Sequence, residues 1–190
     1  MTEILAIVGS ATRPGRLRRA LADASAHPAE GVRVELLDLA DVRIAAADGR
    51  PPEDLGDDTL HVLTAIERAD AVVLATPVYR GSLTGVLKNL LDHVPVTALQ
   101  GKPVGIVAMG ATDHHFLGAE RHLRDILAFF GALVAPVAVY LTSKDFVDGE
   151  PQAAAREALA ELVATVAELS RAVTADGLRP PPLAARARRS

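Results

Sequence analysis

Short apolar runs alternate along the chain with longer amphipathic stretches, and this alternation restricts the fold more than any other feature. Residues 4–8, 71–75 and 104–109 are almost wholly apolar and rich in Val, Ile and Ala. Runs of this length without polar alternation are typical of strands buried on both faces of a parallel sheet. Residues 32–37 alternate at their start and predict a strand nearer the edge of that sheet.

A fifth strand is expected over residues 133–140, where Pro136 interrupts the run. Helical periodicity predicts five helices, over residues 15–26, 57–68, 84–93, 116–130 and 151–173. Asp57 and Asp58 are suited to cap the second helix, and Glu150-Pro151 to begin the last. Residues 40–56 are rich in Asp, Gly and Pro and predict a loop.

Five strands alternating with five helices predict an α/β protein with a doubly wound parallel sheet and helices on both faces. The expected strand order is 2-1-3-4-5, which periodicity alone does not determine. In such sheets ligands bind beyond the carboxyl ends of the strands, at the point where the winding reverses. Binding residues are therefore expected at the exits of strands one, three and four.

Composition excludes several classes of function. The chain has no Cys, which rules out disulfides, thiolate catalysis and Cys-ligated metals. A net charge of −4 and a pI of about 5.8 argue against nucleic acid as a partner. The first residues lack the pattern of a signal peptide, and no apolar run reaches the roughly 20 residues that span a bilayer. We therefore expect a cytoplasmic protein without a membrane partner.

The first exit reads GSATRPGR, over residues 9–16, and lies between a buried strand and a helix. A phosphate there would meet backbone N–H groups, the positive end of the helix dipole and the hydroxyls of Ser10 and Thr12. Arg16 would add a charge-assisted fork, with Arg13 near it. The segment is neither G-x-G-x-x-G nor G-x-x-x-x-G-K-[ST], so it is not a dinucleotide fingerprint or a Walker loop.

The alternative interpretation of this exit is a plain turn followed by a solvated, basic first helical turn. Arginines at positions 13, 16, 18 and 19 oppose the dipole at that end of the helix, so local stability does not explain them. A bound anion would explain them, and the pattern therefore favours an anion site.

The second exit reads TPVYRGSLTGVLKNLLD, over residues 76–92. Pro77 and Gly81 are expected to stiffen and then reverse the chain, which leaves the 78–81 backbone facing outward. Such a backbone can hold the edge of a flat polar heterocycle, with Tyr79 nearby. Periodicity does not separate this interpretation from the alternative, in which Tyr79 is a surface aromatic and the glycines only form a turn.

The same exit carries a specific family resemblance. PVYRGSLTGVLKNLLD is similar to the PVYxxxxxGxLKxLLD segment of the NADPH-dependent FMN reductase family, and VGSATRPGR is similar to that family's GSPxxxSR phosphate loop. The similarity runs from residue 4 to about residue 148 and is greatest to FMN reductases of two-component alkanesulfonate and methanesulfonate monooxygenase systems. It implies one flavodoxin-like domain over residues 1–175. The Pro/Arg-rich tail, 176–190, is expected to be disordered or packed on a neighbouring subunit.

The resemblance implies an NAD(P)H:FMN oxidoreductase, of the EC 1.5.1 type, in which hydride passes from NADPH or NADH to FMN without a catalytic side chain. It implies phosphate contacts from Ser10, Thr12, Gly15 and Arg16. It implies contacts with the isoalloxazine edge from Pro77, Val78, Tyr79, Arg80 and Gly81, and with the pyrimidine side from Gly110, Ala111 and Thr112. Backbone N–H groups near Gly81 and Gly110 would stabilise negative charge on the reduced flavin.

Three positions depart from the family pattern. Gly15 replaces a loop serine, which removes one phosphate hydroxyl, and Ala111 replaces a glycine. Leu83 stands where the alkanesulfonate reductases carry a Tyr that is tied to helix geometry and flavin release. His114 and His115 lie beside the expected flavin, either as flavin or proton partners or, as the pattern favours, as solvated loop residues. No set of His, Asp and Glu has zinc spacing, so no metal site is predicted.

Two other functions stay open. One is a quinone or azo reductase that retains FMN; the other is a non-enzymatic electron carrier of flavodoxin type, although Tyr79 is the only aromatic in the three exits. A response-regulator receiver is excluded because Gly9-Ser10 and Thr76 stand where it needs acidic residues. The resemblance further implies a homodimer or homotetramer and a flavin-dependent monooxygenase as partner. Arginines 13, 18 and 19 leave the choice between NADPH and NADH open.

Overall fold

A computed structural model of the chain describes residues 1–12 and 15–173. Its elements, in chain order, are β1 (Thr2–Val8), α1 (Arg16–Ala26), β2 (Val32–Asp38), η1 (Pro52–Asp54), α2 (Thr59–Arg68), β3 (Ala71–Pro77), α3 (Gly85–His93), α4 (Val96–Leu99), β4 (Pro103–Met109), η2 (Asp113–His115), α5 (Phe116–Phe130), β5 (Leu133–Val134), β6 (Val139–Leu141), η3 (Ser143–Asp145), β7 (Phe146–Val147), β8 (Glu150–Pro151) and α6 (Ala153–Ala172). The predicted tail, 176–190, lies outside the described residues.

The main sheet is parallel throughout, in the order β2-β1-β3-β4-β5, which confirms the expected 2-1-3-4-5. The registers Val8↔Ala75 and Ala75↔Val107 bring the carboxyl ends of the three central strands to one edge. The fifth position is shared by two short strands, because both β5 and β6 pair with β4. Residues 135–138 separate them, so Pro136 lies in the interruption that the sequence predicted.

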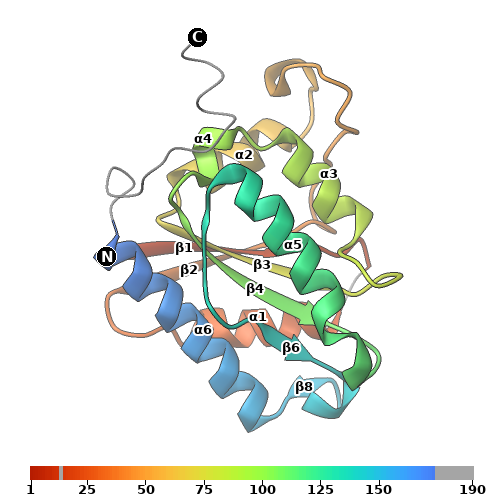
Figure 1. Cartoon of the computed structure of the whole chain (residues 1–190), viewed down its shortest axis with the longest axis vertical. Helices are drawn as coiled ribbons and strands as arrows, with labels where there is room; N and C mark the ends of the chain where they lie inside the picture. The colour runs from red at the N-terminus through yellow and green to blue at the C-terminus, as the bar shows by residue number, and fades with distance from the viewer. Residues whose placement is uncertain (13–14, 174–190) are drawn as a thin grey trace.

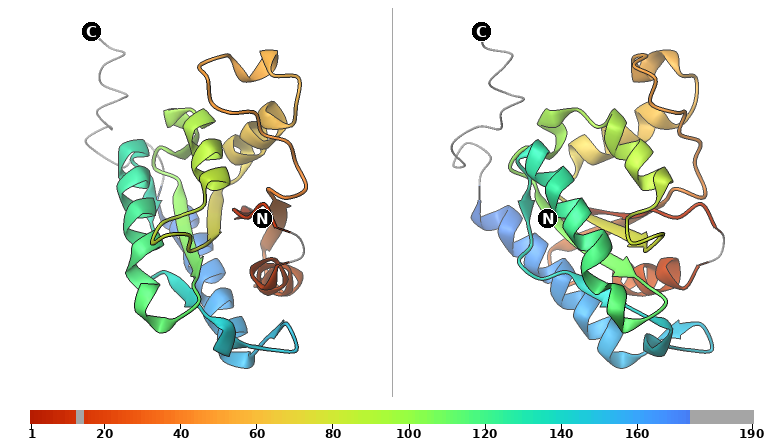
Figure 2. Two further views of the ribbon diagram at one scale, coloured as in Figure 1. Left: turned by 90° about the vertical axis from the view of Figure 1, so that its right-hand side faces the viewer. Right: turned by 45° about the vertical axis from the view of Figure 1, so that its right-hand side comes forward.

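Helices cover both faces of this sheet, with α1 and α6 on one side and α2, α3, α4 and α5 on the other (Figures 1 and 2). Leu17 and Leu21 of α1 pack with Leu159 and Val163 of α6 in the first core. β3 is buried along almost its whole length, whereas β2 alternates between buried and exposed residues, as expected for a central and an edge strand. No helix in the described part of the chain is both long and apolar enough to cross a membrane.

Three local predictions were wrong. Glu150-Pro151 does not start the last helix; it forms β8 and pairs antiparallel with β7, because Asp148 and Gly149 have φ of 51° and 83° and close a tight hairpin turn. The four-residue helix α4 was missed, since it is too short to show periodicity. The predicted side-chain capping of α2 is also not observed: Asp58 is the N-cap residue, but its carboxylate accepts from the Arg43 N–H at 2.8 Å, and Asp57, one residue earlier, accepts from the Thr59 N–H at 2.9 Å.

Candidate functional site

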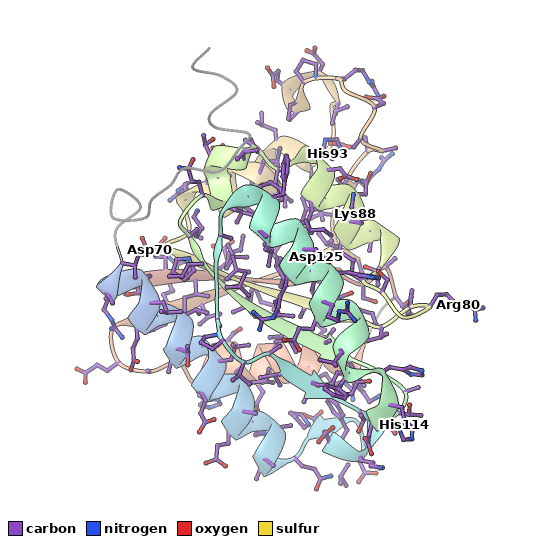
Figure 3. The ribbon with its side chains drawn as sticks, in the orientation of Figure 1. Asp70, Arg80, Lys88, His93, His114 and Asp125 are labelled. Carbon is purple, nitrogen blue, oxygen red and sulfur yellow. The ribbon has the colours of Figure 1, made fainter. Side chains whose placement is uncertain are left out.

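The three exit loops lie side by side at the carboxyl edge of the sheet, as the strand order requires. Direct backbone hydrogen bonds connect them: the Gly9 N–H donates to Ala75 O at 2.6 Å, and the Val78 N–H donates to Met109 O at 2.8 Å. Figure 3 shows Arg80 and His114 at this same edge. The loops therefore form one continuous surface, which is the candidate site.

Two buried threonines, which sequence reasoning missed, hold these loops together. Thr84 caps α3 by accepting from the Leu87 N–H at 3.2 Å, and its hydroxyl donates to Gly9 O at 2.6 Å. Thr76 accepts from the Thr84 N–H at 3.1 Å and donates to Pro77 O at 2.9 Å. A polar residue at the end of an otherwise apolar strand was the signal that could have identified Thr76.

Gly9 is required by this packing. A Cβ at position 9 would lie 2.8 Å from the Cβ of Leu87 and 3.0 Å from Ala75 O, closer than real Cβ atoms approach a neighbour. The first loop therefore passes directly against α3. Ser10 behind it is buried, and its hydroxyl oxygen accepts from the Thr12 N–H at 3.2 Å.

The amino end of α1 is open to an anion. Gly15 is its extended N-cap, no side chain caps the helix, and no acidic residue stands in its first turn. The first N–H groups of the helix therefore have no side-chain acceptor among the described residues. Arg16 lies at this end, with its guanidinium 5.7 Å from the ring centroid of Phe146. An incoming phosphate would meet both the helix N–H groups and Arg16.

The arginine cluster at this helix is only partly explained by an anion. Arg18 pairs with Asp38 at 2.8 Å and with Asp41 at 3.3 Å, and Arg19 lies 3.9 Å from Glu150. These carboxylates already compensate the two arginines, so the inference that all four require an anion was wrong for this pair. Arg16 has no carboxylate partner among the described residues, and Arg13 lies outside them.

The second loop reverses as the sequence predicted. Tyr79 and Ser82 exchange hydrogen bonds of 2.9 and 3.0 Å, and Arg80 and Gly81 between them have φ of 52° and 77°. Two successive left-handed residues define a type I′ turn, an uncommon conformation for an arginine. The N–H groups of Arg80 and Gly81 have no acceptor in the part of the chain that the structure describes. Tyr79 is 52% exposed beside them.

The first turns of α5 support this type I′ turn from behind. A Cβ at Gly118 would lie 2.5 Å from Gly81 O, so only glycine allows the helix to approach so closely. One turn further, the Nδ1 of His122 lies 2.8 Å from the Ser82 hydroxyl. The outward backbone of Arg80 and Gly81 is thus held on a packed base.

The third loop differs from the expectation at Gly110. Its N–H donates to Leu141 O at 2.9 Å, so it is not free for a ligand, and the donors predicted near Gly110 would have to come from Ala111 or Thr112. Gly110 instead makes room for Tyr140: a Cβ there would lie within 3 Å of the phenol. The Tyr140 hydroxyl donates to Thr112 O at 2.7 Å, and burial together with Asp113 raises the pKa of Tyr140. Ala111 and Thr112 are exposed at the site.

The remaining candidates lie at the margin of the third loop. His114 and His115 are exposed, and the nearest polar contact of His115 is to Thr112, 3.4 Å between Oγ1 and Nδ1. Asp113 pairs with Lys144 at 2.6 Å, and this pair lowers the pKa of the carboxyl. Leu83 is half-buried and packs against the core beneath α3 and α5.

Comparison with known proteins agrees with this arrangement. The chain is 42% identical over 115 residues to an NAD(P)H-dependent FAD/FMN reductase of Geobacillus thermodenitrificans, a match that covers 60% of this chain and 62%, less than two thirds, of that protein. It is 38% identical over 151 residues to the NADH-dependent FMN reductase SfnF of Pseudomonas fluorescens, covering 77% and 79% of the two chains.

Among solved structures, the apo form of the NADH:FMN oxidoreductase EMOB superposes with a TM-score of 0.73 over 92% of this chain and 91% of its own, at 24% identity. That likeness concerns the fold. The model of the family described as NADPH-dependent FMN reductase matches residues 2–146, which is most of the chain. This chain therefore belongs to the NADPH-dependent FMN reductase family.

Proposed function

We propose that the carboxyl edge of the sheet binds FMN, and that the protein reduces this flavin with NADPH or NADH. The observation that carries the proposal is the open amino end of α1 beside Arg16. Both groups lie at the point of the sheet where a flavin phosphate is expected, and neither has an acidic partner among the described residues. A phosphate dianion fits this combination of helix dipole and guanidinium.

The phosphate would be held by the first loop and the ring by the other two. We assign the phosphate to Ser10, Thr12, Gly15 and Arg16, the ring edge to Pro77, Val78, Tyr79, Arg80 and Gly81, and the pyrimidine side to Gly110, Ala111 and Thr112. The type I′ turn supports the second assignment, because it presents two N–H donors in a fixed direction. At the third loop, Tyr140 holds the Thr112 carbonyl, which leaves the 111–112 backbone to meet the ring.

The protein's own part in the reaction is orientation and polarity. When bound, FMN supplies the hydride-accepting chemistry, so no acidic or basic side chain is required for this half-reaction. The N–H groups of Arg80 and Gly81 would donate to the ring edge of a bound flavin and stabilise the negative charge of its reduced form. Because Tyr79 is half exposed, the ring position stays accessible to a nicotinamide or to an electron acceptor.

We further propose a homodimer or homotetramer that works in the cytoplasm and passes reduced FMN to a flavin-dependent monooxygenase. The groove between α3 and α5 supports the assembly, because Leu83, Ile126 and Lys88 line it at the surface. The exposure of Tyr79 beside the proposed ring site supports release of reduced FMN to such a monooxygenase. Size-exclusion chromatography with light scattering tests the assembly.

The decisive experiment measures oxidation of NADPH and of NADH with and without added FMN, together with quenching of FMN fluorescence by the protein. We expect oxidation that depends on FMN and saturates with it. An enzyme that stays yellow through desalting and reduces quinones or azo dyes would instead be a flavin-retaining reductase. Absence of both FMN binding and FMN-dependent oxidation would disprove the proposal.

A further inference from the structure

A preformed cavity lies beside the candidate flavin site, under the long segment that joins β2 to α2. Residues 39–58 of this segment run alongside α3 and project as an arch beyond its C-terminal end (Figures 1 and 2). The cavity has a volume of about 930 Å³, at the upper end of the range for small-molecule sites. Its walls come from the arch and from the first turns of α3, including Ile44, Leu55 and Val86.

The arch is fixed by hydrogen bonds rather than free to collapse. The Asn89 side chain of α3 donates to Ala45 O at 2.8 Å and accepts from the Ala47 N–H at 3.0 Å. Asp57 accepts from the Ala45 N–H at 2.7 Å. The Arg43 N–H donates to the Asp58 carboxylate at 2.8 Å, and the Asp58 N–H donates to Arg43 O at 3.0 Å. A cavity whose wall is already ordered costs little entropy to fill.

The position of the cavity relates it to the flavin loops. Ala11 of the first loop and Gly85, the first residue of α3, both line it. Gly85 follows Gly81 of the type I′ turn by four residues, so the ring-edge position and the cavity wall are at most about 14 Å apart along the chain. This separation is within the reach of an extended dinucleotide whose nicotinamide lies at the ring edge.

The lining suits an adenosine 5′-diphosphate. Half-buried apolar side chains, among them Val42, Ile44 and Val86, present a surface on which a base can pack. One carboxylate oxygen of Asp58 accepts from the backbone N–H of Arg43. The other oxygen has no donor within the described residues, so it can accept from a ribose hydroxyl. The Arg43 guanidinium has no carboxylate partner there and can meet a diphosphate.

The charge of the lining distinguishes the two nicotinamide dinucleotides. Asp57 and Asp58 face the cavity with a single guanidinium, that of Arg43. A carboxylate accepts from a ribose 2′-hydroxyl, whereas it repels a 2′-phosphate. We propose that this cavity binds the adenosine diphosphate half of NADH and that Asp58 selects NADH over NADPH. The inference rests on the proposed function, since it supplies the donor for the same flavin.

The test uses the full chain and ADP-ribose as a probe that carries no nicotinamide. Calorimetric titration of ADP-ribose into flavin-free protein is expected to show one site, and ADP-ribose is expected to compete with NADH but not with FMN in steady-state assays. Asp58→Asn keeps the acceptor for the Arg43 N–H but removes the charge. It should raise the KM for NADH about tenfold and reduce the preference for NADH over NADPH by a similar factor, with kcat unchanged.

A matched pair of bulky variants tests the location. Ala46 and Ala47 are both exposed neighbours on the arch, but only Ala46 lines the cavity. Ala46→Trp should weaken ADP-ribose at least tenfold, whereas Ala47→Trp should not, and FMN quenching should stay the same in both.

Competition of ADP-ribose with FMN, or equal effects of the two tryptophans, would overturn the proposal. A preference of the unaltered protein for NADPH, or a preference for NADH that persists in Asp58→Asn, would also overturn it. Absence of FMN binding would disprove the proposed function instead. The two outcomes can be told apart, because the ADP-ribose titration uses flavin-free protein and does not depend on FMN.

Discussion

The same parallel strands end at the two edges of the central sheet, but the polar groups at these edges differ in whether they bond within the protein or face outward. At the amino edge, the Asp70 N–H and carboxylate both bond to the Glu3 backbone at 2.8 Å, and the Gly101 N–H donates to Gly131 O at 2.9 Å. Lys102 donates to the last carbonyls of α2, at 2.5 and 3.0 Å. In Figure 3, Asp70 lies at the opposite end of the sheet from Arg80.

At the carboxyl edge the backbone is held just as firmly, but from beneath. Thr84, Thr76 and Gly118 lie on the inner side of the loops, and the N–H groups of Arg80 and Gly81 face outward. The polar groups of the amino edge are therefore bonded to one another, while the carboxyl edge is a well-packed surface with N–H donors that have no acceptor among the described residues. The difference predicts that substitutions at the first edge change only stability, whereas those at the second change flavin affinity as well.

The largest effect is expected from Gly9→Ala. The new methyl would lie 2.8 Å from the Cβ of Leu87, and the first loop must move away from α3. We expect a loss of about 3 kcal/mol in the free energy of unfolding and the loss of measurable FMN binding. Gly105→Ala is the control, because its methyl meets only the side chains of Leu162 and Val166 at 3.1–3.3 Å. Equal effects of the two variants on FMN quenching would contradict the comparison.

Arg16→Ala should weaken FMN by at least tenfold with little change in thermal stability, because Arg16 is exposed, its contact with the Phe146 ring is a weak one, and its charge-assisted contact would be to the proposed phosphate. Arg16→Lys, which keeps the charge without the planar fork, should recover part of the affinity. The KM for NAD(P)H should change less than the dissociation constant of FMN, measured by fluorescence quenching. If both constants change equally, the phosphate lies elsewhere.

Thr84→Val removes both the cap of α3 and the hydrogen bond to Gly9 O. We expect a loss of about 2 kcal/mol in the free energy of unfolding, measured with urea, and a several-fold weaker FMN complex, since the side-chain hydrogen bond between the start of α3 and the first loop is then lost. Thr84→Ser keeps the hydroxyl and should behave nearly as the unaltered protein. A stable Thr84→Val with normal flavin affinity would show that this bond does not position the site.

Lys102→Met tests the amino edge of the sheet. It should lower the free energy of unfolding by about 1 kcal/mol and leave the FMN dissociation constant unchanged. Burial lowers the pKa of Lys102 from 10.5 to about 8, opposed by Asp70 and Glu67. Between these two values the unfolded chain binds more protons than the folded one, so the stability of the unaltered protein should rise with pH from about 8 to 10.5 relative to Lys102→Met. Parallel stability curves for the two proteins over this range would refute the contribution of Lys102.

Much of the architecture was readable in advance, because periodicity is a local property. The runs that became β1, β3 and β4 are apolar on both faces, and the helix predicted over residues 116–130 is the observed α5. The rule that ligands bind at the carboxyl ends of parallel strands then placed the three exits together. The chain reversal at Gly81 was also predicted from local chemistry, whereas the type I′ geometry, with Arg80 left-handed, was seen only in the structure.

The partners of the polar groups could not be read in advance, because they depend on residues distant in sequence. Arg18 looked free for an anion until the fold placed Asp38 and Asp41 beside it. The N–H of Gly110 looked available until Leu141 was placed opposite. No spacing rule links such positions.

By itself, the sequence determined that the chain has a parallel α/β fold, and it predicted a binding site at three loops on one edge of the sheet, since periodicity and turn residues act over a few positions. Only the tertiary structure decided that, among the described arginines of α1, Arg16 has no carboxylate partner, which N–H groups of the second loop face outward and that a cavity opens beside the first loop. Each of those outcomes depends on which distant side chain or carbonyl occupies the neighbouring space, and that is settled when the layers pack.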